Sequence, residues 1–471
     1  MPARMNRTDV RGGALVALVL AACGGDDGAA PDAPPGDAAT EADAAADGAL
    51  DALVDAPPAG PRTIRVSVTS AGGEAHGNSG DLPTISGDGR FVVFTSDAPD
   101  LVADDTNGTT DVFLHDRTTQ ATTRLNVGPT AEANVSSSTG WISRSGRFVC
   151  FSSGANNLIA SDTNTAEDAF LLDRTTGAIE RVSVSSSEVA GTAGSSCSGV
   201  SDDGRYVNFY SYASNLAPGD SGNSLDAFVR DRQLGTTVLA SATPSGTPGN
   251  GTTIGSMLAG DGSFIVFASN GTDLVTGDTN GAYDVFERAS DGESPAVLIS
   301  RTPGGAPGNG ASNVAFVSAD GSTIAYLSGA SNLVTGDTSG FQDIFVFART
   351  SGVTERVSVG MGGAEANGHS ENPKLSHDGR LVLFISHATN LVPGDTNGKR
   401  DAFVYDRMAG TTVRVSLGAA DEQTTETTYY ASLADDGSFA VFTTPSANLV
   451  PGDTNADNDV FVRDLRAPAL P

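Results

Sequence analysis

The chain has 471 residues, 57 of them glycine, and a formal net charge of -30. Its short apolar runs are separated by Gly, Ser, Thr, Asn and Asp, which is typical of a turn-rich all-β protein. The negative charge argues against nucleic acid or an anionic lipid surface as a partner, because either would require a basic patch. Cations, proteins and neutral glycans stay open as ligands.

Residues 1–22 have the pattern of a signal peptide. Three arginines precede an apolar stretch over residues 14–22, which is too short to span a membrane as a mature helix. The stretch ends in Leu-Ala-Ala before Cys23, which resembles the lipobox of bacterial lipoproteins. This resemblance implies that Cys23 carries lipid and anchors the protein in the bacterial cell envelope, at the periplasmic face or the cell surface. An ordinary secretory signal with an incidental cysteine is the alternative.

Residues 23–60 differ sharply from the rest in composition. They are dominated by Ala, Asp, Pro and Gly, and they contain neither a basic nor an aromatic residue. Such a segment cannot bury enough apolar surface to fold, so we predict a disordered acidic tether. The folded domain is expected over residues 61–471.

A repeated phrase organises the folded domain. It reads DTNGTTDVF at Asp105 and occurs seven times in all, at intervals of 57 to 59 residues, ending with DTNADNDVF at Asp453. Each repeat contains four runs suited to strands, which we name A, B, C and D. In the first repeat they cover residues 82–86, 91–96, 111–116 and 121–127. Repetition of this length predicts a closed or stacked repeat fold.

The properties of the strands favour a seven-bladed β-propeller of four-stranded antiparallel blades. Asp-Gly or Ser-Gly pairs between A and B suit tight hairpin turns, because glycine accepts positive φ. Strand B is apolar on both faces, as in the sequence FVVF that starts at Phe91, so it must lie between packed sheets. Blades packed around an axis meet both requirements.

The two ends of the domain are predicted to meet. The seventh repeat has no D strand, whereas TIRVSV at Thr63 matches the D strands that begin at Thr354 and Thr411. We therefore expect the N-terminal strand to complete the last blade, which removes open sheet edges. An open solenoid is the alternative, but it would need capping repeats that we do not find.

The repeats resemble the WD40-like (PD40) repeat of TolB-type propellers. The shared motif is an S-x-D-G-[RK] turn followed by a strand that ends in F-x-S, and it is met at residues 86–96 and 376–386. Ser263, Ser322 and Ser438 replace the basic residue in three repeats. This family includes periplasmic partners of envelope proteins and non-catalytic domains of peptidases. The resemblance therefore implies the fold and a binding role, but it names no ligand.

The repeated phrase lies between strands B and C, on the face where the D-to-A joins also open. We expect its acidic and amide side chains to form a ring on one rim. These are Asp105, Asn107, Asp111, Asp162, Asn164, Asp168, Asp220, Asp226, Asp278, Asn280, Asp284, Asp337, Asp343, Asp395, Asn397, Asp401, Asp453, Asn455 and Asp459. A further Asn or Asp stands five positions before each first Asp, at Asp100, Asn157, Asn215, Asp273, Asn332, Asn390 and Asn448.

Two interpretations of these loops stay open. Carboxylate and amide oxygens are the ligands that Ca²⁺ prefers, so the loops are candidate calcium sites. However, they lack the third oxygen ligand and the bidentate Glu of known calcium loops. In the other interpretation, the Asp and Asn side chains bond their own backbone in Asx turns and fix the start of strand C.

No catalytic residue is predicted. The five histidines recur at no fixed position, no G-x-S-x-G motif occurs, and Trp141 is expected to pack beside strand A. We therefore expect a monomeric, non-enzymatic scaffold that binds a protein or a glycan. The alternative is a glycan lyase or hydrolase with its site in the propeller funnel, which would require unique acid, base or metal groups that face the axis.

The pairing of Cys150 with Cys197 is left open. An oxidising envelope would allow a disulfide. Cys150, however, occupies a core position that Val93, Val266 and Leu383 fill in other repeats, which favours a buried thiol.

Overall fold

The computed structural model describes residues 62–466 except 161 and 221–223. The predicted signal peptide, Cys23 and the tether over residues 23–60 lie outside the described residues. Within the described part, no helix is both long and apolar enough to cross a membrane.

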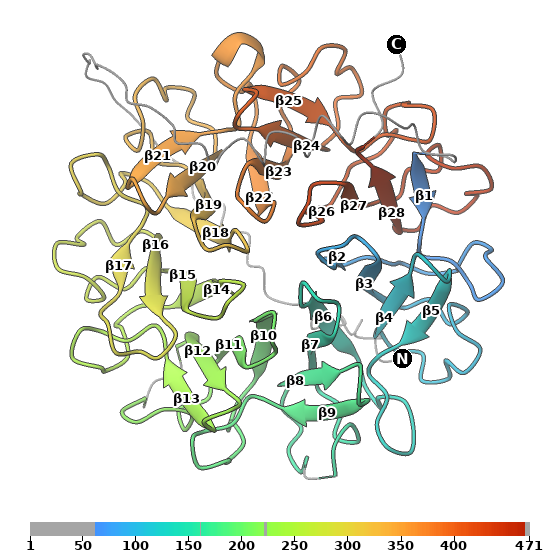
Figure 1. The fold of residues 1–471 in the computed structure, drawn as a ribbon, viewed down its shortest axis with the longest axis horizontal. Coiled ribbons are helices and arrows are strands. Elements are labelled where there is room, and N and C mark those ends of the chain that lie inside the picture. The colour runs from blue at the N-terminus through green and yellow to red at the C-terminus, as the bar shows by residue number, and fades with distance from the viewer. Residues whose placement is uncertain (1–61, 161, 221–223, 467–471) are drawn as a thin grey trace, which may run out of the picture.

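In the described ranges the strands form seven four-stranded antiparallel sheets around a central axis (Figure 1), which confirms the predicted seven-bladed propeller. The innermost A strands are β2 (Thr84–Ile85), β6 (Ser137–Ile142), β10 (Ser195–Val200), β14 (Thr253–Leu258), β18 (Ser312–Val317), β22 (Ser370–Leu375) and β26 (Tyr430–Leu433). The B strands are β3 (Phe91–Ser96), β7 (Phe148–Ser153), β11 (Tyr206–Ser211), β15 (Phe264–Ser269), β19 (Thr323–Ser328), β23 (Leu381–Ser386) and β27 (Phe439–Thr444).

The two outer positions of each sheet are filled in the same order. The C strands are β4 (Asp111–Asp116), β8 (Asp168–Asp173), β12 (Asp226–Asp231), β16 (Asp284–Ala289), β20 (Asp343–Ala348), β24 (Asp401–Asp406) and β28 (Asp459–Asp464). The outermost D strands are β5 (Ala121–Arg124), β9 (Ala178–Arg181), β13 (Thr236–Leu239), β17 (Val297–Leu298), β21 (Val353–Arg356), β25 (Thr411–Arg414) and β1 (Thr63–Arg65). A short 3-10 turn, η2 (Met361–Gly363), precedes β22. Blades one to six run in chain order from β2, and blade seven contains β26, β27, β28 and β1.

Blade seven takes its outer strand from the other end of the described chain. β1 pairs antiparallel with β28, in a register that places Thr63 opposite Arg463 and Arg65 opposite Phe461 (Figure 1). The hydroxyl of Thr63 also donates a hydrogen bond to the carbonyl of Leu417, 2.7 Å away. The first and last described strands therefore lie side by side in one sheet.

Each blade has the same core. An aromatic side chain of strand B stacks on a phenylalanine of strand C, as Phe94 does on Phe113 with ring centroids 6.1 Å apart. Every residue of β7, β15, β19, β23 and β27 is buried. The expected burial of strand B on both faces is therefore confirmed, and it follows from packing each sheet between two others.

The glycine of the A-to-B turn allows this close packing. Gly89 has a φ of 68°, and a side chain there would collide with the ring of Phe439 in blade seven. Glycine is therefore needed both for the turn geometry and for the contact between blades.

Two strands of the first repeat are shorter than predicted. Strand A covers only Thr84–Ile85, because Leu82 has a φ of 48° and cannot continue an extended strand. Strand D ends at Arg124, and Val127 instead forms an isolated bridge with Glu132 in the join to the next blade.

The structure pairs Cys150 with Cys197, against the preference for a buried thiol. Cys150 lies in β7 and Cys197 in β10, both are buried, and their Cα atoms are 6.1 Å apart. Cys150 does occupy the expected core position, but its sulfur faces the inner strand of the neighbouring blade. The disulfide therefore ties blade two to blade three.

Candidate functional site

The second Asp of every acidic loop is the first residue of strand C. In blade six, Asp401 accepts a hydrogen bond from Ser416, 2.6 Å away, and Ser416 accepts one from the backbone N–H of Ala402. Asp284 and Ser300 make the same contact in blade four. These aspartates therefore fix the start of strand C against the end of strand D.

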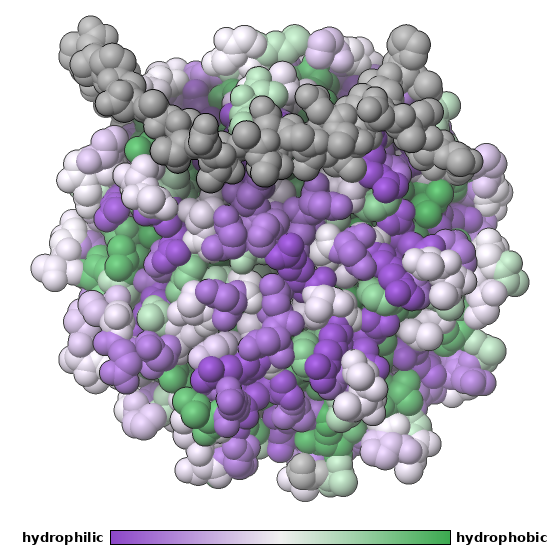
Figure 2. Space-filling view, in the orientation of Figure 1, coloured by the Kyte–Doolittle hydropathy of each residue, from purple (hydrophilic) through white to green (hydrophobic). Residues whose placement is uncertain are grey.

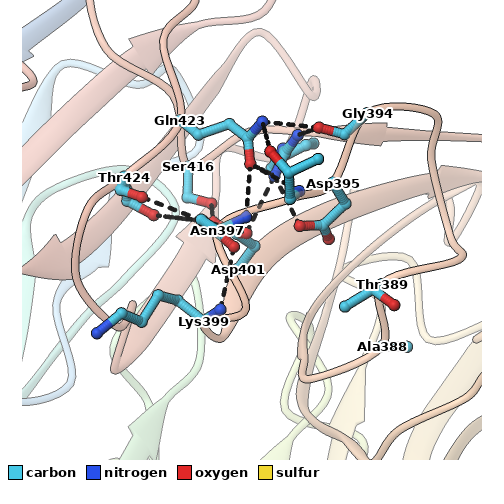
Figure 3. A network of polar contacts seen from close by, with 12 residues as sticks. Ala388, Thr389, Gly394, Asp395, Asn397, Lys399, Asp401, Ser416, Gln423 and Thr424 are labelled. Carbon is cyan, nitrogen blue, oxygen red and sulfur yellow. Dashed lines mark hydrogen bonds and ion pairs between the residues drawn. The ribbon is translucent and has the colours of Figure 1, made fainter.

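In the five loops that have an asparagine after the first Asp, its amide makes an Asx turn. Asn397 accepts a hydrogen bond from the backbone N–H of Lys399, and its Nδ2 donates to Asp401 at 2.9 Å (Figure 3). The same turn occurs at Asn107, Asn164, Asn280 and Asn455. The loops thus have the structural contacts that one of the two sequence interpretations describes.

An arginine that sequence analysis missed lies between the two aspartates. In blade six, Nη1 of Arg414 is 3.2 Å from Asp395 and 3.2 Å from Asp401, and it donates to Gln423 at 2.9 Å. The Arg414 side chain is only 7% exposed. Figure 3 shows the side chains of Asp395, Asp401 and Gln423 close to one another. A guanidinium therefore supplies the positive charge that the two carboxylates attract.

The same contact is made in four other blades, by Arg65, Arg124, Arg181 and Arg356. In blades one, five and seven a glutamate from the D-to-A join also contacts the arginine; these are Glu132, Glu365 and Glu74. The carboxylates of blades one and seven lie close enough together to hold a metal ion. The arginine, however, already contacts all three carboxylates in each of these two blades.

Burial raises the pKa of several loop aspartates. The pKa of Asp226 in blade three and that of Asp284 in blade four each rise to about 6. Asp337, which shares its site with a second Asp and a Glu, also has a pKa of about 6. Burial and the neighbouring Asp459 raise the pKa of Asp453 to about 7, against the effect of Arg65. The ionised form of these groups is therefore costly wherever its charge is not balanced.

The earlier Asn or Asp of each loop has a structural role. Asn390 accepts a hydrogen bond from the backbone N–H of Asn367 and donates one to the carbonyl of Glu365, 2.8 Å away. Asp100, Asn157, Asn215, Asp273, Asn332 and Asn448 accept the corresponding bond in their own blades. These side chains hold each loop to the join that enters its blade.

The second region of interest is the ring of innermost A strands around the axis, which we call the axial channel. Lys374 of β22 has its Nζ 4.6 Å from the ring centre of Phe316 in β18 and 5.3 Å from that of Trp141 in β6. Blades two and six are separated by blades seven and one, so this contact crosses the axis. Trp141 thus belongs to strand A itself and faces the channel, rather than packing beside the strand as expected.

The charge of Lys374 is unbalanced in the channel. Within the described residues no carboxylate lies within ion-pair distance of Nζ, and its two recorded contacts are with aromatic rings. Burial lowers the pKa of Lys374 to about 8, although part of the side chain is still exposed to solvent.

Charged residues also meet at one end of the channel, in the A-to-B turns. Arg144 contacts Asp435 at 2.6 Å and donates to Nδ1 of His377 at 2.7 Å. The backbone N–H of Arg144 approaches Asp202, whose pKa burial raises. These four residues occupy the variable position of the S-x-D-G turn. They break the symmetry of the repeat more strongly than any feature that the sequence singled out.

The histidines of the D-to-A joins are held by local contacts. His369 accepts a hydrogen bond from the backbone N–H of Gln342 through Nδ1, and its ring meets Phe341 edge to face. His76 contacts Asp100 at 2.7 Å on the surface. In the part of the chain that the structure describes, neither ring forms a hydrogen bond with a serine or cysteine side chain. The face shown in Figure 2 is mostly hydrophilic around its centre, with small, scattered apolar patches.

No protein-family model and no curated protein matches the chain. Among solved structures, it is similar to an oligogalacturonate lyase from Vibrio parahaemolyticus, with 16% identity, 86% of this chain and 93% of that chain covered, and a TM-score of 0.49. An oligogalacturonate lyase in complex with manganese gives 13% identity, 87% and 98% coverage and a TM-score of 0.48. TolB from Acinetobacter baumannii gives 13% identity, 73% and 64% coverage and a TM-score of 0.40. At these values the comparisons carry no argument about ligand, metal or reaction.

Proposed function

We propose that the protein is a non-enzymatic binding scaffold, anchored through Cys23 in the bacterial envelope, that takes a carboxylate-bearing partner into its axial channel. The observation that supports this proposal is the unbalanced charge of Lys374 between Trp141 and Phe316. An ammonium group in a low-dielectric setting attracts an anion strongly. The two aromatic rings offer an apolar surface to the part of the partner that carries the carboxylate.

The contacts at the end of the channel favour binding over catalysis. His377, Asp435 and Asp202 are the titratable groups that could act as a base there. Arg144 contacts all three, the first two through its guanidinium and Asp202 through its backbone N–H. A general base needs a free lone pair within reach of the proton that it removes. A glycan lyase or hydrolase is the alternative function, and these same residues would then be its candidates.

Calcium binding by the acidic loops is proposed in a restricted form. Five of the seven loops already hold an arginine at the place where a cation would be attracted, as Arg414 does in blade six. Blades three and four have leucine at that position, at Leu239 and Leu298. The proposed calcium binding is therefore confined to these two blades.

The scaffold can be tested with its two lysines, because Lys374 and Lys399 are the only lysines in the sequence. The full-length chain is applied to arrays of acidic oligosaccharides and acidic peptides, with neutral counterparts on the same surface. We expect acidic probes to bind, Lys374→Met to abolish binding, and the surface variant Lys399→Met to bind normally. Equal binding of neutral probes, or normal binding by Lys374→Met, would contradict the proposal. Turnover of a bound glycan would support the enzyme instead.

A further inference from the structure

The outer strand of each blade presents one residue to the acidic loop. In blade six Arg414 pairs with Phe403 of strand C. In blades three and four the residues in the same register are Leu239, opposite Phe228, and Leu298, opposite Phe286. Both leucines are buried. These two blades have thus exchanged a buried cation for an apolar side chain.

The aspartates that face this position are retained. Blade four has Asp278 and Asp284, which correspond to Asp395 and Asp401 of blade six. Its D-to-A join has Pro307 where blade six has Gln423. Blade four therefore keeps the negative charges of the network and loses both the arginine and the amide beside it.

Asp278 has no partner for its charge. Asp278 is only 4% exposed. Neither of its carboxylate oxygens accepts a hydrogen bond from any residue that the structure describes. The backbone N–H of Asn280 approaches this carboxylate and offsets part of the rise in its pKa, but it falls short of hydrogen-bond geometry. Asp284, in contrast, accepts bonds from Ser300 at 2.6 Å and from Asn280 at 2.7 Å.

A backbone carbonyl oxygen is also available at the place in blade four where the guanidinium is missing. In blades five and six the arginine Nη2 donates to a backbone carbonyl, that of Gly336 or Gly394. The residue at this position in blade four is Gly277. Two carboxylates and a carbonyl are hard oxygen ligands of the kind that Ca²⁺ takes, with water completing six to eight ligands. An ionised carboxylate buried without any counter-charge is strongly unfavourable.

We infer that blade four binds one calcium ion between Asp278 and Asp284, in the place that the Arg414 guanidinium takes in blade six. The inference rests on the calcium part of the proposed function and is independent of the axial channel. Blade three is not included, because it has Gly222 in place of the amide of Asn280, and its Asp220 already has an interaction partner.

Installing the missing arginine gives the most direct test. Calcium binding to the full-length chain is measured by titration calorimetry and by luminescence of Tb³⁺, for which Tyr283 beside Asp284 can act as the sensitiser. We expect one ion per chain. We expect that ion to be lost in Leu298→Arg, because this variant gives blade four the arginine that blade six has. Asp278→Asn should weaken binding about tenfold or more, because it removes a charged ligand. It also serves as the second variant if Leu298→Arg does not fold, which thermal melts would show.

The possible results distinguish where calcium binds from whether the protein binds calcium at all. If the unaltered chain binds no calcium at millimolar concentrations, both the inference and the calcium part of the proposed function fail. If calcium binds with unchanged affinity in Leu298→Arg and Asp278→Asn, the ion lies elsewhere and only the inference is overturned. Stronger binding of magnesium than of calcium would overturn the identity of the ion.

Discussion

Blades four and six contain the same two buried aspartates and differ in what faces them. Blade six balances them with Arg414, whereas blade four has Leu298 and leaves Asp278 without a partner. The repeat can therefore keep its backbone and its turns while one side chain decides whether the charge is balanced from within. This difference teaches that loops with the same aspartates in a repeat protein need not be the same kind of site.

Removing the arginine from blade six should have the largest effect. Arg414→Leu leaves Asp395 and Asp401 buried without their cation, so we expect a loss of about 3–5 kcal/mol in the free energy of unfolding. Urea denaturation in the presence of a chelator measures the loss. Calcium should restore part of it by binding only the folded state. No loss of stability would break the comparison with blade four.

Reduction of the disulfide tests whether blades three and four, which lack the arginine, are stabilised by their covalent link to blade two. The bond joins blade two, which has the arginine, to blade three, which lacks it, and it closes a sequence separation of 47 residues. Its loss should cost up to about 4 kcal/mol, because the unfolded chain gains conformational freedom. Hydrogen exchange should then increase first in blades three and four. An even increase around the ring would contradict this expectation.

Blades one and two differ in a buried titratable residue, and the pH dependence of stability tests this difference. Burial lowers the pKa of His115 in blade one to about 4, from an ordinary value of 6.5. Blade two has Leu172 at this position. The pKa of His115 is lower in the folded state than in the unfolded state. The contribution of the neutral imidazole to stability is therefore fully present above pH 6.5 and is lost as the pH falls toward 4. We expect His115 to account for up to about 3 kcal/mol of this loss.

His115→Leu gives blade one the side chain of blade two and should remove that part of the acid sensitivity. Free energies of unfolding measured at several pH values for both chains provide the check. Parallel curves for the variant and the unaltered chain would exclude His115 as a cause.

The smallest effect is expected at an exposed ion pair of the same chemistry. Arg147 contacts Asp173 at 2.8 Å, but its side chain is 49% exposed, against 7% for Arg414. Water screens this pair, so Arg147→Ala should lower the free energy of unfolding far less than Arg414→Leu does. Urea denaturation beside Arg414→Leu makes the comparison. Equal losses for the two variants would show that burial does not set the difference.

The sequence predicts the blades and the acidic loops because both depend on local patterns. Glycine at the A-to-B turn and the apolar run of strand B recur in every repeat, and the Asp-x-Asn phrase occurs in five of the seven. The arginine was overlooked although it recurs 13 residues after the second Asp, as Arg414 does after Asp401. Its role follows only from the pairing register of strands C and D, which places it at the same level as the loop.

The axial channel could not be read from the repeat. Arg144 and His377 lie 233 residues apart in the chain, and Trp141 and Lys374 are equally distant. No local pattern links them, because the contact depends on closing a ring of blades. These four residues differ from their counterparts in other blades and meet across the axis, whereas the repeated residues that guided the prediction build the blades.

The pairing of β1 with β28 has a consequence for how the protein folds. Blades one to six are built from consecutive strands, so they can grow from local hairpins as the chain emerges. Blade seven must wait, since contacts such as that between Thr63 and Arg463 join residues 400 positions apart. Closing a loop of that length costs on the order of 5 kcal/mol in chain entropy. A permuted chain in which β1 follows β28 directly would replace that long search with a hairpin, and the final refolding phase is expected to become faster while the native contacts stay the same.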